Sequence, residues 1–241
     1  ALFVTILGEE ASALRLAFFA DSASYVLSAV LIAVISVAPL VRDKGAAVGN
    51  PVRKFATELA EGWRFLRGQP ALFQNTLIST VAQMTVGVTL ALTVVYARDV
   101  LDGTLIPYPQ NYPAIEAAIG IGNLVGGLAV GIIGARMRKG WLVVAGFVVM
   151  GLATVFFGLT SNVAIALAMA FVIGIANLVY IVPAQTMFME LTPNELLGRV
   201  IAFRGSLVFG SMTLAMAVSG VMAESVSAGI VIAGFGALMT L

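Results

Sequence analysis

The chain contains no histidine and no cysteine among its 241 residues. These absences exclude disulfide bonds, thiolate nucleophiles, imidazole or thiolate metal sites and histidine-based catalytic triads. Charge is scarce too: Asp, Glu, Lys and Arg together make up 10% of the residues, whereas a soluble globular domain carries about 25%. We therefore exclude a soluble enzyme. We expect no metal, no cofactor and no catalysis, because no apolar run holds the clustered acids that catalysis without His or Cys would need.

Long apolar runs dominate the sequence instead. Hydrophobic residues make up 60% of the chain, and its mean hydropathy is +1.04. A membrane-spanning helix needs about 20 apolar residues. The stretches with little or no charge are 17–40, 72–95, 114–134, 141–160, 163–187, 200–222 and 226–241. With residues 1–8 as the end of an earlier span, these predict an all-α, polytopic membrane bundle of six complete spans, one nearly complete span and a stub.

The basic residues predict the orientation of this bundle. All 13 Lys and Arg residues except Arg15 and Arg98 fall on one alternating set of connections or, for Arg204, just inside a span. Because Lys and Arg concentrate in cytoplasmic loops, we expect 41–71, 135–140 and 188–199 to be cytoplasmic. The expected surroundings are a lipid bilayer that the chain crosses several times, with no nucleic-acid partner; the family resemblance described below implies that this is a bacterial inner membrane.

The long connection 41–71 carries an amphipathic pattern. Asn50 and Pro51 have the form of an N-cap followed by proline in the first helical position. Apolar side chains then recur at helical spacing, at Val52, Phe55, Leu59, Trp63 and Leu66. The pattern predicts an amphipathic helix on the cytoplasmic membrane face. It is either a linker helix between two bundles or an interfacial helix that only anchors the chain.

Asp21, Glu116 and Arg204 are the charges inside the complete spans. An ionisable group in a membrane is costly unless it is paired or hydrated, so each is a functional candidate. We expect Arg204 to extend toward water near the cytoplasmic end of its span as an anchor. Glu116 follows Pro113 in the expected first helical turn, where the helix dipole favours a carboxylate. Glu116 is either a proton-coupling residue or a structural acid.

Asp21 is the stronger proton-coupling candidate from sequence. Apolar residues flank it, and Ser22, Ser24 and Tyr25 follow, whose hydroxyls we expect to hydrogen-bond the carboxylate. A desolvated carboxylate is suited to carrying a proton. The alternative is a structural acid near the outer interface that a neighbouring helix satisfies.

Uncharged polar residues mark the other sites within the spans, namely Gln83, Asn123, Asn177 and Gln185. Such groups must find partners in hydrocarbon, either on a neighbouring helix or in a water-filled cavity that binds substrate. Pro183 removes one backbone hydrogen bond two residues before Gln185. A bent helix with a polar residue near the bend is suited to a moving gate, although membrane helices also contain proline without gating.

Glycines four residues apart recur in the span 114–134. They form two pairs, Gly122 with Gly126 and Gly127 with Gly131. Small residues at this spacing let two helices approach closely. We expect a packing role for both pairs.

The connection GIIGARMRKG resembles the glycine-and-basic loop of the major facilitator superfamily, which joins the second and third helices of each half. Gly131, Arg136, Arg138 and Lys139 match that loop. Ala135 stands where the family has an acid, which places the ion-pair latch of that motif in doubt here. The resemblance implies a gating role for the matching residues.

A second stretch, PAQTMFMELTPNELLGRV, is more specific. It resembles the connection between the tenth and eleventh helices in the branch that contains enterobactin exporters and macrolide efflux pumps. The segments AFFADSASYVLSAVL and EGWRFLRGQPAL resemble the sixth helix and the approach to the seventh. The motif is carried by Pro183, Gln185, Pro193, Glu195, Gly198, Arg199 and Val200. The resemblance implies gating roles for Pro183, Glu195, Gly198 and Arg199.

The family register makes this chain the rear half of a major facilitator fold, from the end of helix 5 through helix 12. It implies three parts: 1–41 with helices 5 and 6 of the N-terminal bundle, 42–71 as the cytoplasmic linker, and 72–241 as the C-terminal six-helix bundle. The start ALFVTILG, without Met or a basic leader, agrees with a fragment. We expect the missing N-terminal helices to be its structural partner.

The resemblance implies a secondary transporter that exports a hydrophobic or amphipathic small molecule, of the drug or siderophore type, by proton antiport. Such pumps bind substrate between two bundles and alternate between inward-open and outward-open states. The scarcity of charge in this sequence fits a weakly ionic substrate. The alternative is a membrane subunit that scaffolds or senses without transport.

Overall fold

The computed structural model describes residues 11–35, 51–102, 105–134 and 136–240. They belong to two compact units, divided between residues 50 and 51, and each unit is described by itself. The first contains helix α2 (Ala11–Val34). The expected stub 1–8, the cap residue Asn50 and the motif position Ala135 lie outside the described residues.

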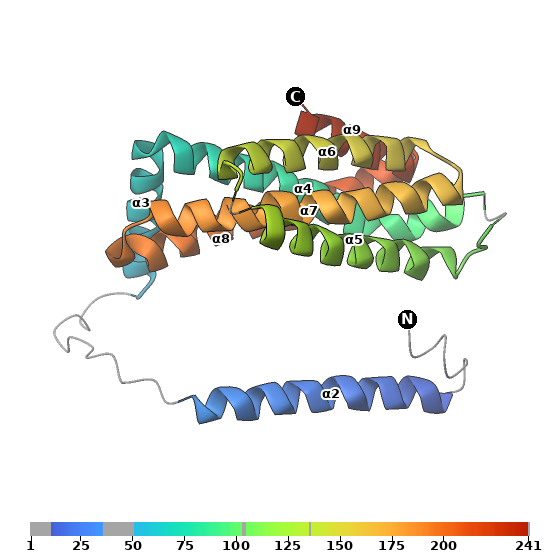
Figure 1. Ribbon diagram of the computed structural model, residues 1–241, viewed down its shortest axis with the longest axis horizontal. Coiled ribbons are helices and arrows are strands. Elements are labelled where there is room, and N and C mark those ends of the chain that lie inside the picture. The colour runs from blue at the N-terminus through green and yellow to red at the C-terminus, as the bar shows by residue number, and fades with distance from the viewer. Residues whose placement is uncertain (1–10, 36–50, 103–104, 135, 241) are drawn as a thin grey trace. The chain divides into compact units, whose positions relative to one another are not determined.

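The second unit is a bundle of helices joined by short connections, and the expected all-α membrane fold is confirmed (Figure 1). Its helices are α3 (Pro51–Gly68), α4 (Pro70–Asp99), α5 (Asn111–Ile133), α6 (Lys139–Leu159), α7 (Val163–Leu191), α8 (Asn194–Ser225) and α9 (Ala228–Thr240). Among the described residues, α4 to α8 are long and apolar enough to cross a membrane. Five of the six expected complete spans are therefore present as long apolar helices, whereas the expected span 17–40 extends beyond the described residues and stays a prediction; α9 is a shorter apolar helix.

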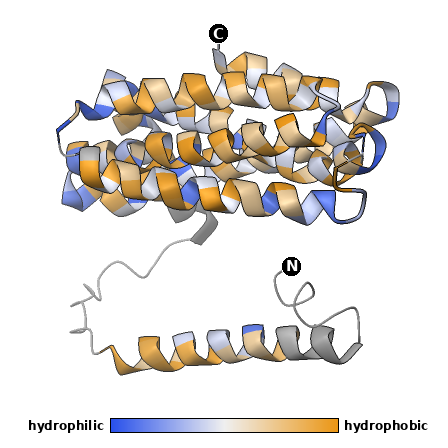
Figure 2. Ribbon diagram, turned by 45° about the vertical axis from the view of Figure 1, so that its right-hand side comes forward, coloured by the Kyte–Doolittle hydropathy of each residue, from blue (hydrophilic) through white to orange (hydrophobic). Residues whose placement is uncertain are grey.

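Several spans, including α4, α7 and α8, are longer than the hydropathy pattern predicts. Helix α8 begins at Asn194 rather than at residue 200, and α7 continues through Pro183 to Leu191 rather than ending at 187. Polar residues at helix ends lie beyond the hydrocarbon, so hydropathy does not detect these turns. Figure 2 shows the consequence: apolar ribbon along the middle of the bundle and hydrophilic segments at its two ends.

The helices pack in a defined spatial order. Helix α7 packs between α5 and α6, α6 also packs against α9, and α9 packs against α4. Helix α4 in turn packs against α8. Helices α5 and α8 therefore stand at the two ends of the series, and α4 and α7 lie between them.

Glycine permits the closest of these contacts. A Cβ added to Gly122 of α5 would overlap the main-chain oxygen of Phe171 in α7, and one added to Gly174 would overlap that of Ile119. A Cβ at Gly126 would lie 2.5 Å from the Ile175 oxygen. The expected packing role is thus confirmed for Gly122 and Gly126. A Cβ at Gly131 would meet nothing within 4 Å among the described residues.

Helix α3 is the amphipathic helix expected from the linker pattern, and it begins at Pro51 as predicted. Its apolar face packs on the bundle: Leu66 is buried with Phe188 of α7 and Val200 of α8. Trp63 contacts the ring of Phe203 at 5.7 Å between centroids. Because this face covers protein, α3 is more than a helix resting on the membrane surface. Its expected role as a linker between two bundles stays a prediction.

Candidate functional site

A cavity of about 130 Å³ lies between α4, α5, α6 and α7. Its polar lining consists of Thr89, Glu116, Thr154 and Asn177, one residue from each helix. The remaining lining is apolar. These helices carry one polar side chain each at corresponding depths, so packing them side by side produces a polar cavity inside an apolar bundle.

Glu116 is half-buried in this cavity. The expectation that it lies in the first turn of its helix is wrong, because α5 begins at Asn111 and places Glu116 in the second turn. Proline is tolerated at the start of a helix, so Pro113 falls within the first turn instead of preceding it. The extra turn moves Glu116 away from the helix end and into the cavity wall.

No basic side chain of the described residues pairs with Glu116. Ion pairs among the described residues join Arg98 with Asp99, Lys139 with Glu190, and Arg199 with Glu61. The hydroxyl donors near Glu116 also hydrogen-bond to other acceptors. The Thr89 and Thr154 hydroxyls donate to main-chain oxygens of their own helices, at 2.9 and 2.8 Å. The carboxylate therefore faces the cavity without a charged partner.

Asn177 and Asn123 meet at the wall of the same cavity. The Asn177 Nδ2 atom donates to Asn123 Oδ1 at 3.1 Å, across the contact between α7 and α5. Asn177 also lines the cavity together with Glu116. The structure therefore brings Glu116, Asn123 and Asn177 together, which the sequence pattern did not indicate. Their roles in substrate binding and proton coupling stay predictions.

A second polar cluster surrounds Arg204, toward the end of the bundle where α8 begins. The Arg204 Nη1 atom donates to Gln185 Oε1 at 3.0 Å, and Nη2 donates to Ser79 Oγ at 2.8 Å. The guanidinium carbon lies 4.7 Å from the centre of the Phe188 ring, within the range of a cation–π interaction. One charged group thereby joins α4, α7 and α8.

The cluster continues into α4. Ser79 Oγ donates to Asn75 Oδ1 at 3.4 Å, and Asn75 Nδ2 donates to the Ala184 oxygen of α7 at 3.0 Å. Ser79 and Asn75 are both buried. Arg204 Nε is buried without an acceptor among the described residues.

The expectation that Arg204 extends to water as an anchor is therefore wrong. It rested on a span beginning at residue 200, whereas α8 begins at Asn194 and places Arg204 in the third helical turn. That is about 15 Å from the helix start at 1.5 Å per residue. At this depth the guanidinium finds protein acceptors instead of water.

Sequence reasoning missed Asn75, Ser79 and Phe188 in this cluster. Asn75 and Ser79 are four residues apart, which places two polar side chains on one helical face. That spacing was a usable signal. No sequence signal marked Phe188, because an aromatic residue in an apolar helix does not indicate that a cation lies beside it.

Of the other predicted residues, Gln83 belongs to neither site, and Asp21 is part of the first unit. Gln83 Nε2 contacts the Met212 sulfur at 3.6 Å, between α4 and α8. Asp21 is exposed within the first unit. The expected hydrogen bonds from Ser22 and Ser24 to its carboxylate are not formed, because these hydroxyls donate to the main-chain oxygens of Phe18 and Asp21. Such bonds within the same helix are the common choice for serine.

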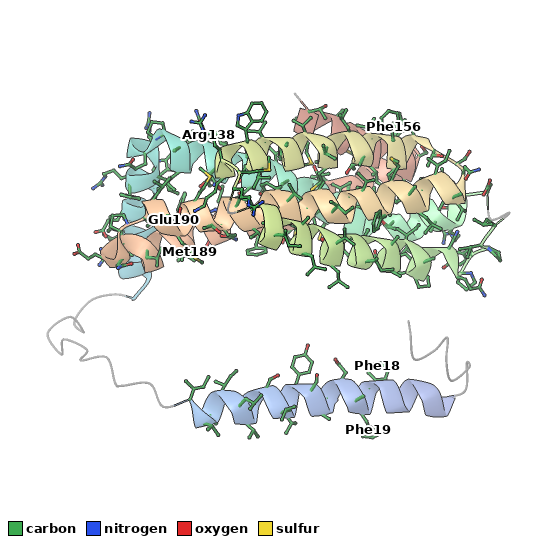
Figure 3. All side chains as sticks on the ribbon, in the orientation of Figure 1. Phe18, Phe19, Arg138, Phe156, Met189 and Glu190 are labelled. Carbon is green, nitrogen blue, oxygen red and sulfur yellow. The ribbon has the colours of Figure 1, made fainter. Side chains whose placement is uncertain are left out.

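The residues of the two motifs gather at one end of the bundle, which contains the start of α6, the end of α7 and the start of α8. Lys139, at the start of α6, pairs with Glu190 of α7, and Arg199 of α8 pairs with Glu61 of α3 at 2.7 Å. Figure 3 shows Arg138 and Glu190 at this end of the bundle. Of the other motif residues, Arg136 is exposed before α6, and Glu195 lies in the first turn of α8. Pro183 is buried within α7. An added Cβ at Gly131 or Gly198 would meet nothing within 4 Å among the described residues.

The fold is that of a polytopic helical membrane protein of the major facilitator type, with polar groups enclosed in its bundle. The profile of the transmembrane secretion effector family matches residues 6–241. The chain therefore belongs to this family of membrane proteins, and the family predicted from the motifs is confirmed. No solved structure matches the chain significantly.

Curated relatives bear the name macrolide efflux protein A. The protein from Streptococcus pyogenes is 25% identical over 208 residues, which cover 86% of this chain and 49% of the relative. The protein from Enterococcus faecalis is 28% identical over 193 residues, which cover 79% of this chain and 57% of the relative. This chain thus spans about half the length of the curated relatives that it matches.

Proposed function

We propose that this chain forms part of a secondary transporter that exports a hydrophobic or amphipathic small molecule from the cell. The observation that carries the proposal is the polar cavity around Glu116 inside a bundle that matches the transmembrane secretion effector family. Enclosed polar groups in membrane helices are typical of substrate and ion pathways. The names of the curated relatives support a compound of the macrolide type as substrate.

The proposal includes proton coupling, alternating access and a bacterial inner membrane. Asp21 and Glu116 are the candidate proton carriers, and Asn123, Asn177, Gln83 and Gln185 the candidate cavity residues. Alternating access requires a second bundle, for which the missing N-terminal helices of the same protein are the proposed partner. The substrate would bind between the two bundles.

Drug accumulation in cells tests the transport step. The intact protein is expressed in a bacterial strain without its own efflux pumps, and uptake of a radiolabelled macrolide is measured with and without a proton uncoupler. We expect lower accumulation than in the empty-vector strain, and equal accumulation after the uncoupler is added. Accumulation equal to the empty vector in both conditions would favour a non-transporting scaffold or sensor.

Single cysteines test whether the cavity opens to water. The described bundle lacks cysteine, so Asn177→Cys introduces one thiol at the cavity wall. Val149→Cys is the matched control, because Val149 is 45% exposed on α6 at a similar depth. We expect a membrane-impermeant maleimide to label the first variant and not the second, because a thiol in hydrocarbon stays protonated. Equal labelling of both, or of neither, would contradict a gated aqueous pathway.

A further inference from the structure

The two charges enclosed in the bundle differ in what surrounds them. Arg204 has side-chain acceptors from two neighbouring helices and an aromatic ring, whereas Glu116 faces a cavity without a basic partner among the described residues. A carboxylate in a membrane segment is costly unless a cation or a proton compensates it. We propose that the cavity beside Glu116 binds the ammonium group of a lipophilic organic cation, with Glu116 as its counter-ion. This inference rests on the proposed transport function and names the substrate class.

The hydrogen-bonding groups of the cavity favour a cation. The Thr89 and Thr154 hydroxyls have already donated their protons to main-chain oxygens, and the Asn177 amide donates to Asn123. Apart from the second N–H of the Asn177 amide, what these groups still offer are oxygen lone pairs, in addition to the carboxylate of Glu116. A site rich in acceptors and poor in free donors attracts an ammonium group and repels an anion.

The apolar part of the lining selects among cations. Ile119, Met150 and Ile173 surround the polar groups, and such surface gains free energy when it covers hydrocarbon. A strongly hydrated inorganic ion would lose its water without enough ligands in return. Among the described residues no three acidic side chains gather as a metal site would require. An alkylated ammonium suits this lining better, because its methyl groups match the apolar walls.

The size of the cavity limits what enters it. Sites for whole drug-sized ligands measure roughly 300–1,000 Å³, whereas this cavity measures about 130 Å³. It therefore holds the charged head group of a ligand, and the rest of the molecule lies outside. A small polar pocket that holds one group fixes the orientation of a larger amphipathic substrate.

A matched pair of probes tests the inference. Trimethylammonium-diphenylhexatriene is a permanent lipophilic cation, and diphenylhexatriene is its neutral parent. Binding of each probe is measured on the intact purified protein in lipid nanodiscs, after subtraction of empty nanodiscs. Because the probes differ in the ammonium group, the difference between their affinities reports on the charge that the site recognises.

Variants of Glu116 then assign that difference to one carboxylate. We expect Glu116→Gln to weaken binding of the cation about tenfold or more, because the quaternary ammonium, which has no N–H to donate, then loses the negative charge that attracts it in a site of low dielectric. Binding of the neutral probe should stay within about twofold of the original protein. Glu116→Asp keeps the charge and should retain most of the cation binding. Glu224→Gln removes an exposed acid near the end of α8 and should change neither affinity.

The outcomes separate this inference from the transport proposal. Unchanged cation binding in Glu116→Gln would overturn the inference, even if that variant no longer transports. Equal loss of both probes in Glu116→Gln and in Glu116→Asp would also overturn it, because the defect would then not depend on charge. If the original protein binds the cation selectively but extrudes neither probe from cells, the transport proposal fails while the cation site stands.

Discussion

The Arg204 cluster and the Glu116 cavity each contain a charged residue within a membrane span, but the surroundings of the two charges differ. Each contains one charged residue that the hydropathy pattern places inside a span. Around Arg204, neighbouring side chains close in and supply acceptors at 2.8 and 3.0 Å. Around Glu116, the neighbouring side chains leave a cavity, and Thr89, Thr154 and Asn177 donate hydrogen bonds to other atoms. A charge satisfied within the fold holds helices together, whereas a charge left facing a cavity is available to a ligand.

The difference follows from the chemistry of the two groups. A guanidinium carries five N–H donors in a rigid plane, so acceptors from several helices can bind it at once and an aromatic ring can stack on it. A carboxylate only accepts hydrogen bonds. In a membrane helix most hydroxyl donors are already bonded to the backbone, so a carboxylate there finds few free donors.

The largest expected effect comes from the glycine contact that holds the wall of the Glu116 cavity. Gly122→Val would push α5 away from α7, because even a Cβ at this position overlaps the Phe171 oxygen. We expect a loss of about 3 kcal/mol in the free energy of unfolding, measured on the intact protein by denaturant titration in mixed micelles. The cation affinity of the cavity should fall with it.

Gly234→Ala is the matched control for this substitution. Gly234 lies in α9 beside an open apolar groove, and a Cβ there meets nothing within 4 Å. Alanine favours a helix over glycine by up to about 1 kcal/mol, so the control should be unchanged or slightly more stable. Equal destabilisation of both variants would show that the contact between α5 and α7 does not hold the cavity wall.

A medium effect is expected from removing one acceptor of the Arg204 cluster. Gln185→Leu leaves Arg204 Nη1 without its acceptor, and we expect a loss of about 1–2 kcal/mol in the same titration. The double variant Gln185→Leu with Arg204→Met should be no less stable than the single variant. Removing both partners leaves no unpaired charge in the bundle, and such replacement is often neutral or stabilising.

Two results would break the contrast between the regions. The first is a double variant whose loss equals or exceeds the sum of the two single losses. The second is a Glu116→Gln protein that loses as much stability as Gln185→Leu. Either result would mean that the charges in the two regions make the same kind of contribution to the fold.

The smallest effect is expected from the exposed ion pair between Arg199 and Glu61. Their N–O distance is 2.7 Å, close to that of the Arg204 hydrogen bonds, but 46% and 38% of their side-chain surfaces are exposed. Because water screens such pairs, Arg199→Gln should cost less than about 1 kcal/mol in the free energy of unfolding. A loss larger than that of Gln185→Leu would show that the link between α3 and α8 carries more stability than the Arg204–Gln185 hydrogen bond.

Much of the fold was predictable because membrane helices are encoded locally. A run of apolar residues is visible in the sequence as it stands, and α4, α5, α6 and α7 begin within three residues of the expected starts. The helix ends were less predictable where polar turns extend a helix beyond the hydrocarbon. Asn194 to Arg199 are such a case, and they moved Arg204 from the helix end into the bundle.

The candidate sites were predictable only as separate residues. Glu116, Asn177 and Asn123 each stood out as polar groups in apolar runs. No sequence signal placed Glu116 and Asn177 on one cavity, and none indicated the hydrogen bond between Asn177 and Asn123. Asn75 and Ser79 were missed because serine and asparagine near a span end carry little weight in a hydropathy pattern. Their importance depends on Arg204, which follows Ser79 by 125 residues.

The sequence by itself determined the membrane class, the family and the scarcity of charge within the spans, and it predicted an orientation. Those properties follow from hydropathy, from the distribution of Lys and Arg, and from short motifs, which are all local in the chain. Only the tertiary structure decided which enclosed charge has partners and which faces a cavity. Partnership depends on distances of about 3 Å between side chains on different helices, and these are set by how closely residues such as Gly122 and Gly174 let the helices approach.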